Sequence, residues 1–366
     1  MEKSLYSQYV NKYFPMLVTS IVEQINEKRD GALTYLYQSL LEPTFSADGR
    51  WASILAEYTR VAADVISLDS ELPIKSRDAI ETAQGEIPKI GVKMYMTEKQ
   101  MKDLDGMIAQ NLPLNRILNV MFADAPRCIQ AVYERIEDIF LSELSSGVGV
   151  SERNNGTGLR ISMNFLAANQ FGVSKVWEGN SADCLPLDDI QKIFDKALED
   201  NNTITDVYAD DTWLRGFYRS QQVRSQYAFN MGVTTVNNSV PVLDFDKAAA
   251  VLMTKWGITL HRVARKVKTE INGKKKNHNP WAKGVATFVC DNNLGNLIWT
   301  TCAEATRPVA GVEYVEADDF ILASRYSTND PLREFTSAQA MCIPVLNNVD
   351  RIYTLNSTEV QSENAD

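Results

Sequence analysis

The sequence has few of the side chains that carry enzymatic chemistry. Its 366 residues include two histidines and five cysteines, and the cysteines are scattered without a close pair. An odd number of separated cysteines favours buried, reduced thiols over disulfides, and their spacing matches no zinc motif. We therefore expect no metal site, no cofactor and no catalytic residues.

Two further absences concern membranes and nucleic acids. No window approaches the roughly 18 consecutive apolar residues of a membrane helix, and residues 1–24 lack the basic segment and apolar run of a signal peptide. The chain has 37 Lys and Arg residues against 47 Asp and Glu residues, a net charge of -10. Because phosphate affinity comes from clustered Lys and Arg, we expect no tight nucleic-acid binding.

The remaining candidates for chemistry have simpler structural interpretations. His261 and His278 lie near no acid or serine in the sequence. The acid pairs Asp188–Asp189 and Asp210–Asp211 stand at expected helix starts, where N-capping and the helix dipole explain them. The lysines at 274–276 could touch phosphate, but three lysines at a hairpin tip usually form a solvated turn.

Hydrophobic periodicity predicts one long helix in the middle of the chain. It begins at Asp124 and ends at Gly147, and roughly 20 helical residues span about 30 Å. Such a helix can act as a strut. Its expected apolar stripe is Cys128, Val132, Ile136, Ile139, Phe140 and Leu144. Its expected solvent side is Arg127, Glu134, Arg135, Glu137 and Asp138.

Other helices are expected near the N-terminus and after residue 96. Residues 1–42 read as helical, with a break or bend at Pro15. Thr97 and Gln100 have the spacing of a capping box. The apolar positions expected in the first helix are Tyr9, Tyr13, Leu17 and Ile21.

Strand-type segments flank these helices. Residues 61–96 contain short strand-like runs around a charged middle, "KSRDAIETAQGE", which predicts a long two-stranded hairpin or extended loop. Because an isolated ribbon is marginal in water, it must lie on something else. The glycine-rich residues 145–158 predict a loop. "NG" at 272–273 predicts a hairpin and "VATFVC" a buried strand. A break at Pro344 and a last strand, "DRIYTL", close the chain.

Four segments carry a family resemblance by their order and spacing. They are residues 67–101, 112–147, 279–299 and 329–355. The chain resembles a major capsid protein of a tailed bacteriophage with the Hong Kong 97-type fold, within the family typified by the lambda major head protein. That family implies an α+β fold with five parts. They are an N-terminal helical arm (1–47), an extended loop (48–96), a peripheral domain with the long spine helix (97–150), an axial domain (151–311), and a peripheral return with a C-terminal tail (312–366).

The resemblance implies a structural protein rather than an enzyme. Its copies would form the pentamers and hexamers of an icosahedral shell around phage double-stranded DNA, in the virion, after assembly in the cytoplasm of a bacterial host. The extended loop would reach across one neighbour and the arm under another. Residues implied at subunit interfaces are Lys75, Arg77, Glu86, Lys89, Lys93, Arg127 and Arg135.

The same resemblance implies partners. These are other copies of the chain, a separate scaffolding protein, a portal and, where one exists, a decoration protein. The packaged DNA would be contacted weakly and without specificity, and no membrane is involved. Some family members crosslink a loop lysine to an asparagine. The counterparts here would be Lys75, Lys89 or Lys93 with Asn347 or Asn348, but surface charge and turn formation explain these residues more simply.

Three alternatives stay open. An encapsulin-type nanocompartment would share the fold and enclose protein cargo. A small-molecule enzyme would use His261 or the acid pairs in a concave pocket. A tail component would form tubes in place of shells.

Overall fold

The chain folds into two compact units. The computed structural model describes residues 1–27, 34–54, 82–154, 157–177, 183–232, 243–271 and 274–361. Unit 1 comprises residues 1–51, 85–140 and 296–345, and unit 2 comprises residues 52–84, 141–295 and 346–366. Each unit therefore joins segments that are distant in sequence.

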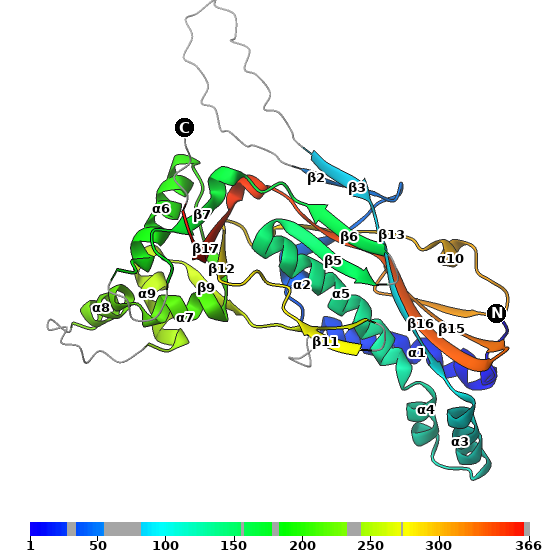
Figure 1. The fold of residues 1–366 in the computed structure, drawn as a ribbon. Helices are drawn as coiled ribbons and strands as arrows, with labels where there is room; N and C mark the ends of the chain where they lie inside the picture. The colour runs from blue at the N-terminus through cyan, green and yellow to red at the C-terminus, as the bar shows by residue number, and fades with distance from the viewer. Residues whose placement is uncertain are drawn as a thin grey trace, which may run out of the picture. The chain divides into compact units, whose positions relative to one another are not determined.

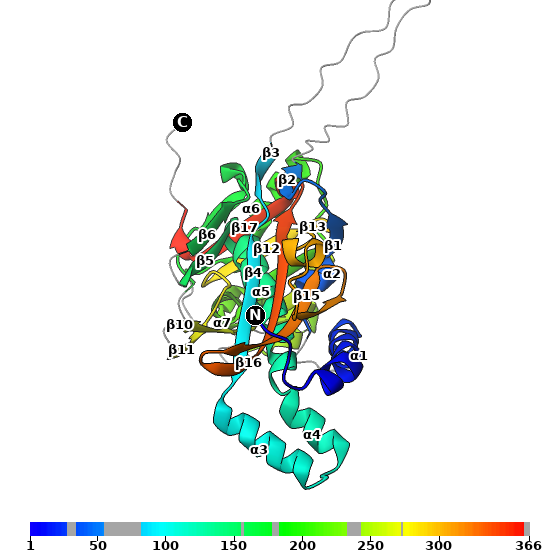
Figure 2. The same ribbon diagram turned by 90° about the vertical axis from the view of Figure 1, so that its right-hand side faces the viewer.

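Unit 1 is built on a six-stranded sheet. The strand order is β1-β13-β16-β15-β14, and β4 also pairs with β16 (Figures 1 and 2). The strands are β1 (Leu41–Phe45), β4 (Lys89–Met96), β13 (Gly295–Thr300), β14 (Glu313–Ala317), β15 (Ile321–Asn329) and β16 (Leu332–Leu346). The predicted break at Pro344 is wrong, because β16 continues through it. A strand can contain proline at a position where no neighbouring strand requires a backbone N–H donor.

The helices of unit 1 pack on this sheet and on each other. They are α1 (Ser7–Asn26), α2 (Tyr37–Leu40), α3 (Glu98–Ala109), α4 (Leu114–Met121), α10 (Ala303–Thr306) and the first part of α5 (Asp124–Ser146). The capping box at Thr97 is confirmed, since the Thr97 N–H donates to Oε1 of Gln100 at 2.8 Å.

Helix α1 differs from its prediction in two respects. It runs through Pro15 without a break. Its buried face is Val10, Phe14, Val18, Ile21, Val22 and Ile25, so Ile21 is the one predicted core position that is buried. The predicted and observed faces are both spaced by four residues and adjoin each other on the helix, so periodicity alone did not separate them.

Helix α5 confirms the predicted central helix. All six residues of the predicted stripe are buried, and Gly147 follows the helix with φ +69°. The predicted solvent side is partly wrong, because Glu137 and Asp138 are buried. Glu137 accepts hydrogen bonds from the backbone N–H groups of Leu36 and Tyr37, at 3.0 and 3.1 Å, and so holds the start of α2.

Unit 2 is built on a five-stranded sheet of order β7-β17-β12-β8-β9. Its strands are β7 (Gln170–Val173), β8 (Asp206–Asp210), β9 (Thr259–Val263), β12 (Val285–Val289) and β17 (Ile352–Val360). Its helices are α6 (Pro186–Glu199), α7 (Asp211–Arg219), α8 (Gln221–Asn230) and α9 (Phe245–Trp256), with short 3-10 turns η2 (Ala167–Asn169) and η3 (Val349–Arg351). Trp213, Phe217 and Phe288 lie at the centre of its core. The buried strand predicted for "VATFVC" is confirmed as β12.

Three two-stranded ribbons complete the structure. They pair β2 (Arg50–Ile54) with β3 (Thr82–Glu86), β5 (Val148–Asn154) with β6 (Thr157–Ser162), and β10 (Val267–Ile271) with β11 (Lys274–His278). The first lies within the expected extended loop (48–96), but β2 precedes the predicted hairpin (61–96), and "TAQGE" forms a strand and not part of the tip. The second corrects the predicted loop at 145–158. The third confirms the predicted hairpin pairing, while 272–273 and most of the extended loop, 55–81, lie outside the described residues.

Candidate functional site

Five of the predicted interface residues are described by the structure, and they fall on three elements of unit 1. Glu86 ends β3, and Lys89 and Lys93 lie on β4, with all three exposed. Arg127 and Arg135 lie on α5. Lys75 and Arg77 fall outside the described residues. The structure thus gathers one group along β4 and places the two arginines on a separate element.

Strand β4 forms an edge of the sheet. It pairs with β16 on one side, and no strand among the described residues pairs with its other side. Such an edge presents unpaired N–H and C=O groups to another chain, and charged side chains limit indiscriminate pairing. Lys89 makes an ion pair with Glu304 of the same chain. The hydrogen bond from Lys89 lowers the pKa of Glu304.

A row of aromatic rings crosses the outer face of this edge. The ring of Phe335 lies 5.7 Å from Tyr95 and 5.2 Å from Tyr326, so β4, β16 and β15 each contribute one ring. Lys93 Nζ lies 5.6 Å from the Phe335 ring, and the Arg333 guanidinium lies 4.2 Å from the Tyr95 ring. Tyr95 is exposed, and Phe335, Tyr326 and Arg333 are half-buried. Aromatic and arginine side chains are the types that anchor protein interfaces. Sequence reasoning missed this row, because its members become neighbours only through strand pairing.

The two arginines of α5 have partners within their own helix. Arg127 Nη1 lies 3.6 Å from Asp124, and 67% of its side chain is exposed. Arg135 Nη1 lies 2.6 Å from Asp138 and is more enclosed. Arg127 is therefore the freer of the two for an external contact.

Sequence reasoning also missed a buried charge cluster that anchors the N-terminus in unit 1. Arg325 Nε donates to Oε1 of Glu334 at 3.0 Å, and both side chains are buried. Arg325 also donates to the carbonyl of Met121 at 2.8 Å and stacks over the ring of Phe122. Glu334 accepts hydrogen bonds from the Ser4 hydroxyl and the backbone N–H of Leu5.

This cluster changes the expectation for the N-terminal arm. Glu2 exchanges two backbone hydrogen bonds with Ser327, at 2.9 and 3.0 Å, and α1 buries its apolar face in unit 1. The arm implied by the resemblance reaches under a neighbour, whereas residues 1–26 here pack on their own chain. The six buried apolar side chains of α1 and the Ser4–Glu334 contact are the physical reason.

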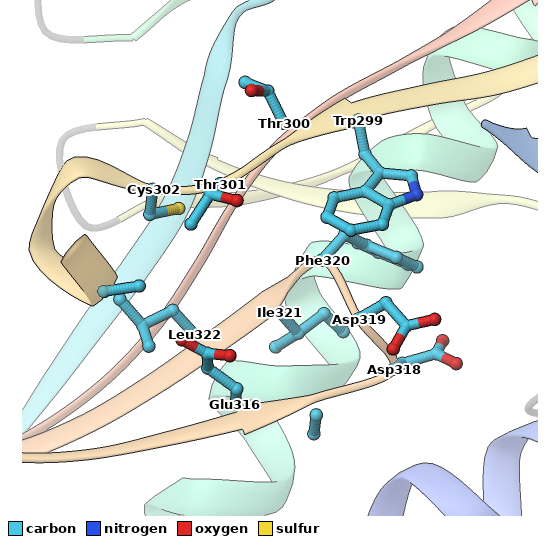
Figure 3. A pocket seen from close by; sticks show the side chains of 12 residues that line it. Trp299, Thr300, Thr301, Cys302, Glu316, Asp318, Asp319, Phe320, Ile321 and Leu322 are labelled. Atoms are coloured by element: carbon cyan, nitrogen blue, oxygen red, sulfur yellow. The ribbon is translucent and has the colours of Figure 1, made fainter. Parts of the chain in front are cut away.

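One hollow of unit 1, about 320 Å³ in volume, lies between the end of β13 and the β14–β15 hairpin (Figure 3). Trp299, Cys302 and Phe320 line it beside the carboxyls of Asp318 and Asp319. The Asp318 carboxylate has a structural role, since it accepts hydrogen bonds from the Asn26 side-chain amide and from the Tyr133 hydroxyl, at 2.8 and 2.6 Å. Burial raises the pKa of the Cys302 thiol, which keeps it protonated and a poor nucleophile.

The acid pairs have structural partners, but the predicted N-capping is found only at Asp210, because α6 has no side-chain cap. Asp210 caps α7 by accepting the Trp213 N–H at 2.9 Å. Asp189 is buried and accepts from the Ser174 N–H and hydroxyl and from the Trp177 indole. Asp211 borders a hollow of about 470 Å³ in unit 2, where the Arg262 guanidinium donates to both of its oxygens.

The histidine and cysteine side chains have structural settings. His261 Nε2 lies 2.7 Å from Asp206, and its ring stacks on Tyr208. All five cysteines are free and buried, which confirms the predicted burial. Within the described residues, no three His, Cys, Asp or Glu side chains form a group that could hold a metal ion, and no helix has the length and apolar character that a membrane crossing needs.

Comparison with known proteins identifies the fold. No protein-family model matches the sequence, and no curated protein matches it significantly. Among solved structures, the chain is similar to a protein assigned as a prophage capsid protein from E. coli CFT073. The TM-score is 0.56 at 13% identity, with 92% of this chain and 98% of that chain covered. This likeness shows the α+β, Hong Kong 97-type fold that the family resemblance implied.

Two further solved structures are more distant. A phage-related protein from Bordetella bronchiseptica RB50 has a TM-score of 0.48 at 9% identity, covering 93% of this chain and 96% of that one. An encapsulin complex from Synechococcus elongatus PCC 7942 has a TM-score of 0.40 at 12% identity, covering 89% and 88%.

Proposed function

We propose that this chain is a major capsid protein, whose copies form the pentamers and hexamers of an icosahedral shell around phage double-stranded DNA. The observation that carries the proposal is the extent of the fold likeness. It spans 92% of this chain and 98% of a protein assigned as a prophage capsid protein. Because one fold can serve several functions, the surfaces of this chain must also suit assembly.

The surfaces of unit 1 support assembly. The open edge of β4 lies beside the aromatic row of Tyr95, Phe335 and Tyr326, and the β2–β3 ribbon leads directly into β4. An exposed edge strand favours pairing with another chain, and a two-stranded ribbon is marginal unless it packs on something. Contacts between two different patches of one chain close into rings, which is how a single sequence makes pentamers and hexamers.

The five-part division of the chain belongs to this proposal. Residues 48–96 would cross a neighbouring copy, residues 97–150 and 312–366 would form the peripheral domain, and residues 151–311 the axial domain. Residues 1–47 would stay with their own subunit through the Ser4–Glu334 contact and the buried face of α1. Glu86, Lys89, Lys93, Arg127 and Arg135 would lie at subunit contacts, together with Lys75 and Arg77.

The proposed partners follow from this role. A separate scaffolding protein would set the shell size, a portal would occupy one vertex, and a decoration protein could bind outside. The protein would act in the virion after assembly in the bacterial cytoplasm. It would have no enzymatic activity of its own.

Electron microscopy and particle analysis test the proposal. The chain is expressed alone and together with its scaffolding protein, and the products are examined by negative stain and light scattering. We expect uniform angular shells from the pair, and irregular assemblies or none from the chain alone. Uniform shells from the chain alone would remove the scaffolding requirement.

The contents and size of the particles separate the alternatives. Shells that carry an enzyme and no DNA would support a nanocompartment, and tubes would support a tail component. A monomer at all concentrations, with or without the scaffolding protein, would overturn the proposal.

A further inference from the structure

Basic charge is concentrated in one short part of unit 2. Residues 262–283 contain eight of the 37 Lys and Arg residues and one of the 47 acidic residues. The chain as a whole has a net charge of -10. This local reversal of sign is therefore a feature of one structural element, the β10–β11 ribbon and the residues beside it.

The ribbon exposes its lysines on both faces. In its antiparallel register, Lys276 stands opposite Thr269, and Lys275 stands opposite Glu270. Strand alternation therefore places Lys274 and Lys276 on one face, and Lys275 and Lys268 on the other. Residues 274–277 are all exposed, whereas Val267, at the base of the ribbon, is buried.

These lysines are not neutralised within the described part of the chain. Arg262 pairs with Asp211, but Lys268, Lys274, Lys275 and Lys276 form no ion pair there. Glu270 is the only acidic residue between 262 and 283, and it stands opposite one lysine. The ribbon therefore presents an excess of positive charge that an anionic partner would offset.

The composition of the ribbon favours nucleic acid over protein as that partner. Protein interfaces are depleted in lysine and depend on aromatic or apolar anchors at their centre, and β11, "KKKNH", offers neither aromatic nor aliphatic anchors apart from its histidine. Interfaces with nucleic acid are far more positively charged.

The geometry of the ribbon also suits a duplex. A two-stranded ribbon fits the major groove, which is about 12 Å wide. Two residues along a strand advance by about 6.8 Å, and two phosphates of one DNA strand rise by the same distance along the duplex axis, at about 3.4 Å each.

We propose that the β10–β11 ribbon binds the phosphate backbone of double-stranded DNA through Lys268, Lys274, Lys275 and Lys276. The contact would be independent of base sequence and sensitive to salt, because it consists of phosphate neutralisation by lysines. The acidic remainder of the chain keeps the binding weak. The proposal rests on the proposed function to the extent that the packaged genome is the ligand.

Fluorescence anisotropy of a labelled 30-base-pair duplex tests the proposal. The full-length chain is kept below its assembly concentration and titrated between 50 and 200 mM salt. The variant carries Lys274→Gln, Lys275→Gln and Lys276→Gln. A matched control carries Lys12→Gln, Lys99→Gln and Lys102→Gln, which removes the same charge from exposed positions in α1 and α3.

We expect the ribbon variant to bind about 100-fold more weakly at 0.1 M salt, with the slope of log affinity against log salt reduced by about 2 to 3. The control should stay close to the natural chain. Lys→Arg at the same three ribbon positions should retain the affinity, since the charge is kept. Circular dichroism verifies that each variant is folded.

Two outcomes would overturn the proposal. Equal losses in the variant and the control would mean that only net charge matters. Unchanged DNA affinity with altered self-assembly would assign the ribbon to a contact between copies. Shell formation by the same variants, scored by electron microscopy, is a separate readout. Shells without ribbon-dependent DNA binding would refute this inference alone, whereas ribbon-dependent binding without shells would refute the proposed function alone.

Discussion

The buried pair of Arg325 and Glu334 joins the N-terminus to the sheet of unit 1. A charge removed from water is tolerated only while its partner and hydrogen bonds remain. Here the pair lies on the neighbouring strands β15 and β16, and Glu334 also holds Ser4 and Leu5. These two side chains therefore determine where the first residues of the chain lie.

Loss of this partner should be costly. We expect Glu334→Ala to lower the free energy of unfolding of the unassembled chain by about 3–5 kcal/mol, because Arg325 would stay buried without a counter-charge. Urea denaturation measures the change. Glu304→Ala is the matched control, since it removes the same side chain from the exposed pair with Lys89 and should cost about 0–1 kcal/mol. Equal effects of the two substitutions would contradict the role of the cluster.

Glu143 is another buried acid, and its carboxyl group has no hydrogen-bond partner within the described residues. Neither of its carboxyl oxygens has a hydrogen bond within the described residues, and a Cβ on Gly149 would lie 2.5 Å from one of them. Burial raises the pKa of Glu143 well above its ordinary value. The folded protein therefore holds a proton on Glu143 under conditions in which the unfolded chain releases it.

This difference predicts a pH-dependent effect of Glu143→Gln. The pKa of Glu143 is about 4.5 in the unfolded chain and higher in the folded protein. Between these two values the unfolded chain binds fewer protons than the folded protein, so the free energy of unfolding falls as pH rises. Glutamine at position 143 does not titrate, so the variant does not lose stability in this way as pH rises. We expect the variant to have a higher Tm than the natural chain at pH 8, with the gap closing towards pH 4.5. Thermal unfolding over this range measures it, and a gap independent of pH would show that Glu143 does not titrate in this way.

At the scale of elements, α5 ends where its backbone turns left-handed. Gly147 has φ +69°, and a Cβ there would lie 2.8 Å from the ring of Phe165. Glycine is required on both counts, since other residues seldom adopt this conformation and none would fit the space. The strand β5 begins one residue later, at Val148.

Gly147→Ala and Gly106→Ala should therefore have opposite effects. We expect the first to destabilise the chain by about 1–3 kcal/mol through backbone strain and the clash with Phe165. Gly106 lies inside α3 with open space around it, so alanine there should stabilise by about 0.5–1 kcal/mol. Chemical denaturation of both variants compares them. A stabilising effect at position 147 would show that the helix end can relax.

Local signals predicted α5 and α3 well and β16 poorly. The stripe from Cys128 to Leu144, the stop at Gly147 and the capping box at Thr97 each act within a turn or two of the residues that encode them. Strand β16 depends on β4, β13 and β15, which lie far away in sequence, and these partners keep it extended through Pro344. Buried Glu137 has the same cause, because its hydrogen bonds go to a segment about 100 residues earlier.

At the scale of the whole molecule, we expect the proposed shell to hold together without a covalent link between copies. Lys89, one of the lysines considered for crosslinking, is engaged with Glu304. We expect mature particles to dissolve on denaturing electrophoresis into a single band at the 41.0 kDa mass of the chain. A ladder of heavier species that survives denaturation would show that crosslinks form. Substitution of Lys75, Lys89 and Lys93 in turn would then identify the lysine.

The candidate contact surfaces were predicted in part. Lys89 and Lys93 were expected at an interface and do lie on an open strand edge, while their place at a contact stays a prediction. The aromatic row and the Arg325–Glu334 cluster were not predicted, because their members come from different strands and helices. The lysines at 274–276 were read as a solvated turn. The structure shows that β10 pairs with β11, so these lysines lie on an exposed ribbon with an excess of positive charge.

The sequence by itself determined the long central helix with its buried stripe, the capping box at Thr97 and the burial of the scattered cysteines. Each of these depends on composition or on interactions within one or two turns of the chain. The tertiary structure decided which face of α1 is buried, which acids lose water, and that residues 1–26 pack on their own chain. Those outcomes depend on residues distant in sequence. Burial and desolvation contribute to the free energy of folding only when such residues pack together.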